Sequence, residues 1–505
     1  METKTKYVDP AKEKKKLLIT AIKKTINNNA VLPILEDVYL TGKEAVMTDL
    51  GNSVIIPFKT PNAKGVCVPA NMLVTFLEMM ENPDIVSDKN FGVTASEGKR
   101  VVKVMGENPD NYPVVPMFNK TETERGDQPY PSIGNLVTSD MESLEDALSF
   151  VSKDDLRPAM TGVFFEQKGV EASKTSWMVA TDAHRLFWKP ISDLTESFTL
   201  PAKAAKILLA LGGEWALTSD SHQQIKDGKV VYKQPTMKVR QLPAHFIENG
   251  VAYKGDKSDN VEMYEKYWKD NYESFTAYCE DRLDDECFNL DDENQKEWVE
   301  VPDPDKKPEP VFVDATHICF ERKDGVKVIT RIIDARFPNY RVVIPEGVGN
   351  VIATVGKEEM LRELKNASKF ANKSTHQVTL GMNGSFTISS QDVDWSFEYK
   401  NDIDGTFEIK DTLPKEYELN GKPARIIKDL GTIVKVSFNG KEKDIMRTEL
   451  TELPPHLYIA FNGNFLAEIV NKIPKGEPVK IKMWAPTKAA IINENYLVMP
   501  LMLNS

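Results

Sequence analysis

The chain has 505 residues with a net charge of −12, and 41% of them are hydrophobic, so it can bury several hydrophobic cores and is long enough for about three or four domains. No apolar run approaches the roughly 20 residues of a membrane span, and residues 1–16 lack the apolar segment of a signal peptide, which predicts a cytoplasmic protein. The four cysteines are too few for a disulfide scaffold and lack the paired spacing of a zinc site. The negative net charge argues against a protein that binds nucleic acid with its whole surface. A basic stripe on one face is still compatible with that net charge.

One pattern of helix, strands, helix and strands occurs three times along the chain. Amphipathic helices with apolar residues three and four apart are predicted at 11–26, 140–151 and 357–371. A strand end that turns into a second helix follows each of them, at 68–77, 200–209 and 459–469. Strand-like segments rich in β-branched and aromatic residues lie between the helices, at 45–57, 162–166 with 176–180, and 377–388. The repeat predicts an α+β protein of three domains, 1–130, 131–347 and 348–505, each with two helices packed on antiparallel sheets.

Two segments interrupt this repeat. The first, at about 224–312, contains acidic runs and a proline-rich stretch at 301–310. Its aromatic residues at near-helical spacing either pack on their own domain or form a docking helix for a partner: Tyr264, Tyr267, Trp268, Phe275 and Tyr278. The second, at about 404–455, has alternating strands and the hairpin signal Asn439-Gly440, which predicts a small β module. Its mixture of lysines and acids is compatible with protein or nucleic-acid contact.

Five ordered motifs carry a resemblance to a known family. The segment Ala180-Thr181-Asp182-Ala183-His184-Arg185-Leu186 is similar to the Ala-Thr-Asp-Gly-His-Arg-Leu signature in the middle domain of the bacterial sliding clamp, the beta subunit of the replicative DNA polymerase. The other matches are Leu32-Pro33-Ile34-Leu35, Val68-Pro69-Ala70, Ile333 to Arg341 followed by Val343-Ile344-Pro345, and Tyr496 to Leu501. The resemblance leaves out the two insertions. Because proteins of this family are usually compact, two large insertions suggest a divergent member, encoded by a cell or by a phage. The expected location is the bacterial cytoplasm, or the host cytoplasm if a phage encodes the protein.

The resemblance implies a protein that acts without bond chemistry and without a cofactor. Clamps of this family are head-to-tail homodimers in which six similar domains close a ring around double-stranded DNA, so this chain would form half of a closed ring. The clamp loader and the replicative DNA polymerase are the implied partners, and no membrane is involved. A topological link lets such a ring slide while its contacts with DNA remain weak and independent of sequence.

The resemblance also implies two functional surfaces. In the family, partners insert a short apolar peptide into a cleft on the middle domain beside the C-terminal tail. The matching positions are Met160, Thr181, Ala183, His184, Leu186, Pro338, Val343, Val498, Met499, Pro500, Leu501 and Leu503. The alternative is that the tail is an ordinary terminal strand that alternates into a core. The second surface is the basic face of the repeat helices, expected to face DNA or, alternatively, merely to be solvated: Lys14, Lys15, Lys16, Lys23, Lys24, Lys203, Lys206, Arg362, Lys365, Lys369 and Lys373.

Two other classes of function are weighed against the clamp. Asp182 and His184 could form a base with an orienting carboxylate, but the sequence contains no His-Glu-x-x-His pattern, no phosphate-binding Gly-x-x-x-x-Gly-Lys loop and no Gly-x-Ser-x-Gly elbow, so we do not expect an enzyme. A clamp-like docking protein without ring closure is the second alternative. Retention on circular but not on linear DNA separates it from a true clamp.

Overall fold

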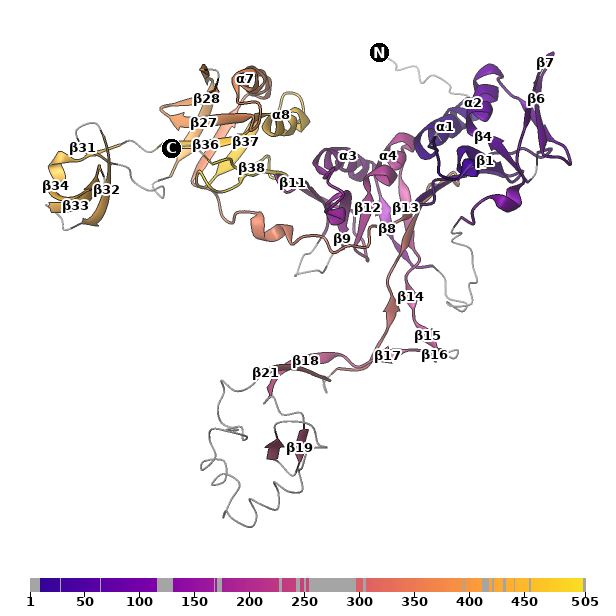
Figure 1. Cartoon of the computed structure of the whole chain (residues 1–505), viewed down its shortest axis with the longest axis horizontal. Coiled ribbons are helices and arrows are strands. Elements are labelled where there is room, and N and C mark those ends of the chain that lie inside the picture. The colour runs from indigo at the N-terminus through magenta and orange to yellow at the C-terminus, as the bar shows by residue number, and fades with distance from the viewer. Residues whose placement is uncertain are drawn as a thin grey trace, which may run out of the picture. The chain divides into compact units, whose positions relative to one another are not determined.

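The computed structural model describes residues 10–27, 29–63, 65–115, 130–167, 169, 175–226, 229–241, 246–248, 251–253, 297–302, 306–392, 394, 396–410, 417–419, 422–429, 433–439, 441–453 and 456–502. These residues belong to two compact units (Figure 1). The first is drawn from Met1–Asn119, Tyr130–Asp220 and Ala315–Ser505, and the second from Ser221–Asp314. No helix among the described residues is long and apolar enough to cross a membrane.

Six α-helices of the first unit confirm the helices predicted from the repeat. They are α1 (Pro10–Thr25), α2 (Ala70–Met79), α3 (Thr138–Ala147), α4 (Ala202–Leu211), α7 (Lys357–Phe370) and α8 (Gly463–Lys472). Helix α7 shows why the pattern is reliable, because its buried residues Met360, Glu363, Leu364 and Ala367 follow the spacing of one helical face. Helix α3 ends earlier than predicted, and the chain continues as a 3-10 turn, η3 (Leu148–Phe150).

An eight-stranded antiparallel sheet joins the first repeat to the second. Its strands in spatial order are β4 (Val66–Pro69), β1 (Asp37–Leu40), β2 (Glu44–Thr48), β3 (Asn52–Pro57), β25 (Lys327–Arg331), β24 (His317–Glu321), β13 (Trp215–Ser219) and β8 (Ser132–Leu136). The junction is the pairing of β3 with β25, in which Ile55 lies opposite Lys327 and Val54 opposite Val328. Hydrogen bonding therefore continues across the predicted boundary between the two domains.

A nine-stranded antiparallel sheet joins the second repeat to the third. Its strands in spatial order are β12 (Phe198–Pro201), β9 (Gly162–Glu166), β10 (Ser176–Thr181), β11 (Arg185–Ile191), β39 (Tyr496–Val498), β38 (Ala490–Ile492), β37 (Val479–Met483), β26 (Val351–Val355) and β30 (Gly405–Ile409). The last strand lies inside the segment predicted as the second insertion, yet it pairs with β26 along its whole length. That part of the segment belongs to the main sheet, and the separate β module begins after it.

Smaller sheets complete the first unit. Three antiparallel strands end the first repeat: β5 (Asp84–Ser87), β6 (Gly92–Glu97) and β7 (Arg100–Met105). Four end the third: β29 (Phe397–Ile403), β28 (Ser385–Asp392), β27 (Gln377–Asn383) and β36 (Leu457–Asn462). The β module has β34 (Lys441–Met446), β33 (Ile433–Phe438), β32 (Lys422–Asp429), β31 (Tyr417–Leu419) and β35 (Thr451–Glu452). Its β33–β34 hairpin occurs where Asn439-Gly440 predicts one, with Asn439 at a φ of 52°.

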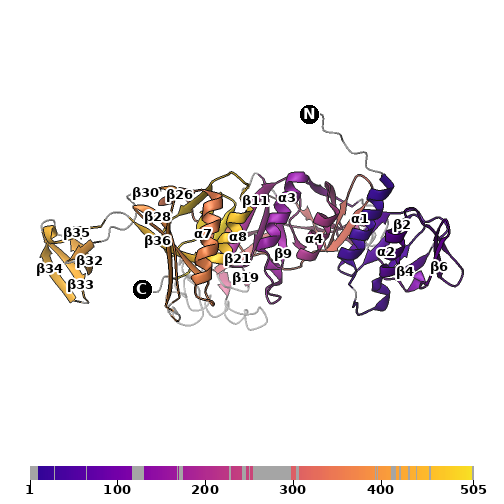
Figure 2. The ribbon, with the colours of Figure 1, turned by 90° about the horizontal axis from the view of Figure 1, so that it is seen from above.

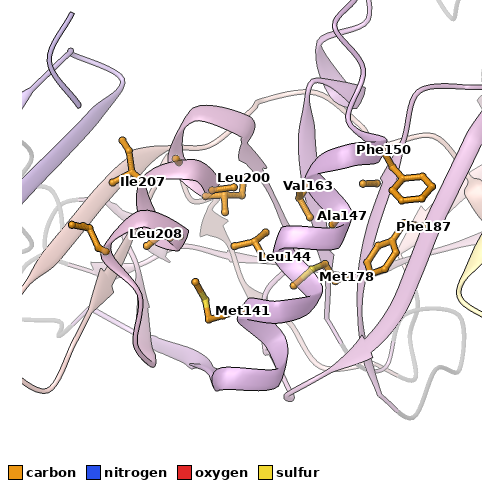
Figure 3. Packing of buried hydrophobic residues seen from close by; sticks show 14 of the residues in the cluster. Met141, Leu144, Ala147, Phe150, Val163, Met178, Phe187, Leu200, Ile207 and Leu208 are labelled. Atoms are coloured by element: carbon orange, nitrogen blue, oxygen red, sulfur yellow. The ribbon is translucent and has the colours of Figure 1, made fainter. Parts of the chain in front are cut away.

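The helices pack on the sheets through one large hydrophobic core. Figure 3 shows Met141, Leu144 and Ala147 of α3 against Phe187 of β11 and Met178 of β10. All five side chains are at most 7% exposed. Burial of this apolar area, worth about 25 cal/mol per Å², is the main stabilising contribution to the unit.

The second unit is built on a two-stranded antiparallel ribbon. The outgoing strands β14 (His222–Gln223), β17 (Tyr232–Lys233) and β18 (Thr236–Gln241) pair with the returning β23 (Phe312–Val313), β22 (Glu309–Pro310) and β21 (Glu297–Pro302). Two short hairpins belong to it, β15 (Ile225–Lys226) with β16 (Lys229–Val230) and β19 (Phe246–Glu248) with β20 (Val251–Tyr253). The aromatic residues 264–278 lie outside the described residues.

The first repeat buries a carboxylate without a charged partner. Asp37 at the start of β1 is 5% exposed, and its Oδ2 accepts no hydrogen bond from the described residues. Burial, together with the nearby charges of Glu107 and Glu36, raises the pKa of Asp37 to about 6. The folded chain therefore holds a proton more tightly than the unfolded chain, and stability falls as pH rises through about 6.

We expect Asp37→Asn to stabilise the protein at pH 8, because the amide removes the charge that burial penalises. The gain is about 1–2 kcal/mol after allowance for solvent screening, and it shrinks as pH falls from 6 towards 4, where the native carboxyl is protonated. Urea unfolding of both proteins at pH 8 and pH 5 measures the difference. Asp334→Asn, at an exposed position, is the control. Equal gains at both pH values would show that ionisation of Asp37 is irrelevant.

Candidate functional site

Antiparallel pairing of β11 with β39 brings the two strongest sequence motifs together. Arg185 lies opposite Val498 and Leu186 opposite Leu497. The register continues past the strand ends, because the Met499 amide donates to the His184 carbonyl at 2.9 Å. Two residues later the Leu501 amide donates to the Ala460 carbonyl of β36 at 2.7 Å. The C-terminal tail therefore crosses from the second repeat to the third, held by its backbone.

The turn between β10 and β11 presents His184 to solvent. The Asp182 Oδ1 accepts hydrogen bonds from the amides of His184 and Arg185 at 3.0 and 2.8 Å. Thr181 accepts from the Ala183 amide and donates to the Arg185 carbonyl. Ala183 has a φ of 74°, a left-handed conformation that the glycine of the family signature adopts without strain. The carboxylate of Asp182 thus shapes the turn, and it is committed to Arg185 and to backbone amides.

Arg185 is a central residue of this region that was not among the predicted site residues. Its side chain is 7% exposed and pairs with Asp182 at 2.8 Å and with Glu468 of α8. It also donates to the Ser149 carbonyl at 3.0 Å, and its guanidinium lies 4.3 Å from the ring centre of Phe465. One side chain thus links β11 to η3 and α8. Its position within the Thr-Asp-x-His-Arg-Leu motif was the sequence feature that could have identified it.

A second hydrophobic cluster lies beside the turn, and we call it the connector cluster. Its buried members are Val179, Leu186, Trp188, Phe337, Tyr340, Trp484, Ala489, Ile491 and Leu497. Ile344 and Met499 are partly buried against it. Phe337 stacks on Phe164 with ring centres 4.7 Å apart.

Hydrogen bonds fix the chain that connects the second repeat to the third over this cluster. Tyr340 donates its hydroxyl to Glu166 at 2.8 Å, and Arg341 forms an ion pair with the same carboxylate. Further along, Trp484 donates its indole N–H to the Glu346 carbonyl at 2.9 Å. The connecting segment therefore has a defined path.

The predicted cleft residues divide by exposure. Ala183, His184, Pro338 and Val343 are exposed, and Met499, Pro500 and Leu501 are partly exposed. By contrast, Met160, Thr181, Leu186 and Val498 are buried, and Val498 belongs to the main core. Met160 ends the 3-10 helix η4 (Pro158–Met160), which contacts β9. Leu503 lies outside the described residues. A ligand can therefore reach the exposed and partly exposed residues, whereas the buried residues lie in the packed core beneath them.

The helices of the first unit form a second continuous feature. Helix α7 packs on α8, α3 on α4, α4 on α1, and α1 on α2. Helix α8 is tied to α3 by the ion pair of Lys472 with Asp146 at 3.4 Å. Figure 2 shows these helices following one another in a row. Helices that lie far apart in the sequence thus lie next to one another in this row.

Solved structures with this arrangement come from bacterial replication proteins. The DNA polymerase III beta subunit of Thermotoga maritima matches with a TM-score of 0.59 and 16% identity over 98% of each chain. The DNA polymerase sliding clamp of Bacillus subtilis matches with a TM-score of 0.59 and 14% identity over 98% of each chain. A ligand-bound sliding clamp of Pseudomonas aeruginosa matches with a TM-score of 0.58 and 14% identity, over 97% of this chain and 98% of its own. The chain has the sliding-clamp fold. Neither a protein-family model nor a curated protein matches its sequence.

On this sliding-clamp fold the predicted DNA-facing residues differ in their availability. Lys203 is occupied, since its Nζ pairs with Asp49 at 2.5 Å and donates to the Thr25 carbonyl at 3.1 Å. Lys23 pairs with Glu78, and Arg362 with Glu359 and Glu363. Lys15 donates to the Met80 carbonyl, and Lys369 to Asn366. Among the described residues, no carboxylate pairs with Lys14, Lys16, Lys24, Lys206, Lys365 or Lys373.

Basic charge is unevenly distributed along the helix row. The free lysines concentrate on α1 and at α7, whereas α3 exposes Glu142 and Glu145 and contains no lysine or arginine. Lysines on only some of the helices attract phosphate groups but do not form a continuous basic surface. This pattern suits weak contacts with a polyanion better than tight binding.

Proposed function

We propose that this protein is a DNA sliding clamp, a processivity factor that encircles duplex DNA and tethers a DNA polymerase. The observation that supports it most directly is the sliding-clamp fold across nearly the whole chain, with a row of helices on which α1 and α7 carry free lysines. The three-domain division of the clamp and the DNA-facing role of these lysines are parts of the same proposal. The chain itself performs no bond chemistry in this role.

Ring closure requires a second copy, and two open sheet edges offer the contact. Among the described residues, strand β7 pairs along one side only, and it exposes Val101 by 57% and Met105 by 69%. Strand β29 is likewise an edge strand and exposes Phe397 by 51%. Exposed apolar edge strands pair readily with another chain. One edge lies in the first repeat and the other in the last, so a contact between them, made twice, closes a head-to-tail dimer.

Charge and rigidity support this pairing. Strand β7 carries Arg100 and Lys103, while β29 carries the two carboxylates Glu398 and Asp402 and one lysine, Lys400. The β29 edge is held in place by Glu363 of α7, which accepts hydrogen bonds from Tyr399 and Asn401. The hydrogen bonds from Tyr399 and Arg362 lower the pKa of Glu363, so this anchor stays charged at neutral pH.

We expect the double variant Val101→Asp/Met105→Asp to be monomeric and to leave circular DNA as fast as linear DNA. In the dimer, two carboxylates in an apolar contact would lose their hydration without gaining partners. The free-energy cost of this desolvation outweighs the association free energy of a moderate interface. Sizing at several concentrations and retention on nicked circular plasmid measure the two effects. Val114→Asp, at a position 96% exposed, is the matched control.

Intact protein that dissociates equally from circular and linear DNA would overturn ring closure. It would leave the alternative of a docking protein with a clamp fold. In that case a partner would still bind the surface formed by His184, Val343, Met499 and Leu501, because that surface lies within one chain.

This surface is our proposed site for partner peptides. It combines exposed apolar side chains with a methionine, a composition that accommodates different extended ligands in turn. Polymerase and clamp loader would compete for it. Val498 is buried in the main core, as a residue of an ordinary terminal strand would be, whereas the partial exposure of Met499 and Leu501 supports the peptide site.

A further inference from the structure

The first repeat contains a basic pocket that the sequence did not predict. It is open to solvent and has a volume of about 440 Å³, within the range of small-ligand sites. Four lysines, one carboxylate and one amide line it, together with apolar side chains: Lys14, Lys15, Lys43, Lys59, Glu81, Asn82, Pro57, Phe58, Leu77 and Pro83. Helices α1 and α2, which contribute Lys14, Lys15 and Leu77 to its wall, are labelled in Figure 2, and strand β3 contributes Pro57. In a chain with a net charge of −12, this concentration of lysines is a local exception.

The hairpin of β2 and β3 places the basic and apolar groups side by side. The Phe58 amide donates to the Lys43 carbonyl at 3.0 Å, so these two residues are direct neighbours across the strands. Lys59 follows Phe58 in the chain. Lys43 and Lys59 are exposed, and Phe58 is half-buried against the main core.

Three of the lysines are available to a ligand. Lys15 is occupied by the Met80 carbonyl at the end of α2, and Glu81 is paired with Lys12 at 2.6 Å. Among the described residues, no carboxylate pairs with Lys14, Lys43 or Lys59. The turn opposite them is fixed, because the amides of Glu81 and Asn82 both donate to the Glu97 carboxylate. These hydrogen bonds lower the pKa of Glu97, so the turn keeps its shape at neutral pH.

We propose that this pocket binds one unpaired nucleotide, with its phosphate on Lys14, Lys43 and Lys59 and its base on the apolar floor around Phe58. Lysine ammonium groups bind phosphate as point charges, and all four cations of the lining are lysines. Aromatic and apolar floors accept the faces of bases without regard to sequence. A base inside a duplex cannot offer its face, so the ligand is a free nucleotide or a single strand.

The proposal is tested by binding of fluorescein-labelled (dT)12 to the full chain, followed by anisotropy without clamp loader or polymerase. We expect Lys43→Glu/Lys59→Glu to weaken binding at least tenfold. The matched control Lys475→Glu/Lys488→Glu changes the net charge equally at exposed positions outside the pocket and is expected to stay within twofold. Because both pocket substitutions lie outside the helices proposed to face duplex DNA, failure here and failure of the clamp proposal are distinguishable.

Competition identifies the ligand. Thymidine monophosphate and unlabelled (dT)12 are expected to displace the probe, and an abasic 12-mer to do so at least fivefold less well. Displacement by the mononucleotide at the same concentration as by (dT)12 assigns the pocket to free nucleotides, and stronger displacement by (dT)12 assigns it to a single strand. Equal losses in the pocket variant and the control, or equal competition by blunt duplex or by the abasic strand, would overturn the proposal.

Discussion

Val343→Asp is expected to abolish stimulation of the polymerase while the protein still remains on circular DNA. Val343 lies beside Tyr340 and Ile344, which fix the connecting segment on the connector cluster, and its side chain is 42% exposed. A carboxylate in an apolar contact loses hydration without gaining a partner. A cost of about 3 kcal/mol lowers affinity for a partner peptide more than 100-fold. Primer extension with a matched polymerase and loader measures the effect as product length.

The control for this variant comes from the same segment. Val348 is 61% exposed and lies beyond the part that covers the connector cluster, so Val348→Asp is expected to extend primers like the parent protein. A second variant that ends at Val498 removes Met499 and the rest of the tail and should also fail in extension. Normal product lengths from both Val343→Asp and the shortened chain would remove the proposed peptide surface.

Arg185→Met is expected to destabilise the first unit by about 3–5 kcal/mol. The methionine fills similar volume but leaves Asp182, whose side chain is 14% exposed, without its ion pair. It also removes the hydrogen bond to the Ser149 carbonyl and the interaction with the Phe465 ring. Chemical unfolding followed by tryptophan fluorescence measures the change, since Trp188 lies on the same strand.

An exposed ion pair provides the comparison for Arg185. Arg157 pairs with Asp154 at 2.8 Å with side chains 50% and 35% exposed, so Arg157→Met should change stability by less than about 1 kcal/mol. A loss of similar size in the two variants would show that the connections of Arg185 to η3 and α8 add nothing to an ordinary surface pair.

Periodicity was sufficient to locate the helices, because each buries one face against a sheet. The apolar residues of α7 recur at helical spacing, and those of α4 include Ala204, Ala205, Ile207, Leu208 and Leu211. Local signals also located the Asn439-Gly440 hairpin. The sequence grouped the strand Gly405–Ile409 with an insertion, because a short edge strand gives no sign of which sheet it joins, even though Phe407 and Ile409 alternate with polar residues.

In the candidate site, too, the sequence revealed local features but not those that depend on packing. The motifs around Thr181–Leu186 and Val498–Leu501 could be recognised in the sequence, but not which of their side chains remain accessible. Burial of Val498 and Leu186 follows from the pairing of β11 with β39 and from packing on both sides of the sheet. Lys203 was predicted to face DNA, yet Asp49 and the Thr25 carbonyl, both distant in sequence, occupy its amine.

By itself the sequence determined the positions of the six helices, the hairpin at Asn439-Gly440 and the motif that shapes the His184 turn. These depend on residues close together in the chain, where spacing and side-chain type act directly. Only the tertiary structure decided that two sheets continue across the boundaries between repeats, that Arg185 joins three elements, and that lysines of α1 meet Lys43 and Lys59 around a pocket. Such features arise from residues tens to hundreds of positions apart, and only packing of the whole unit brings them together.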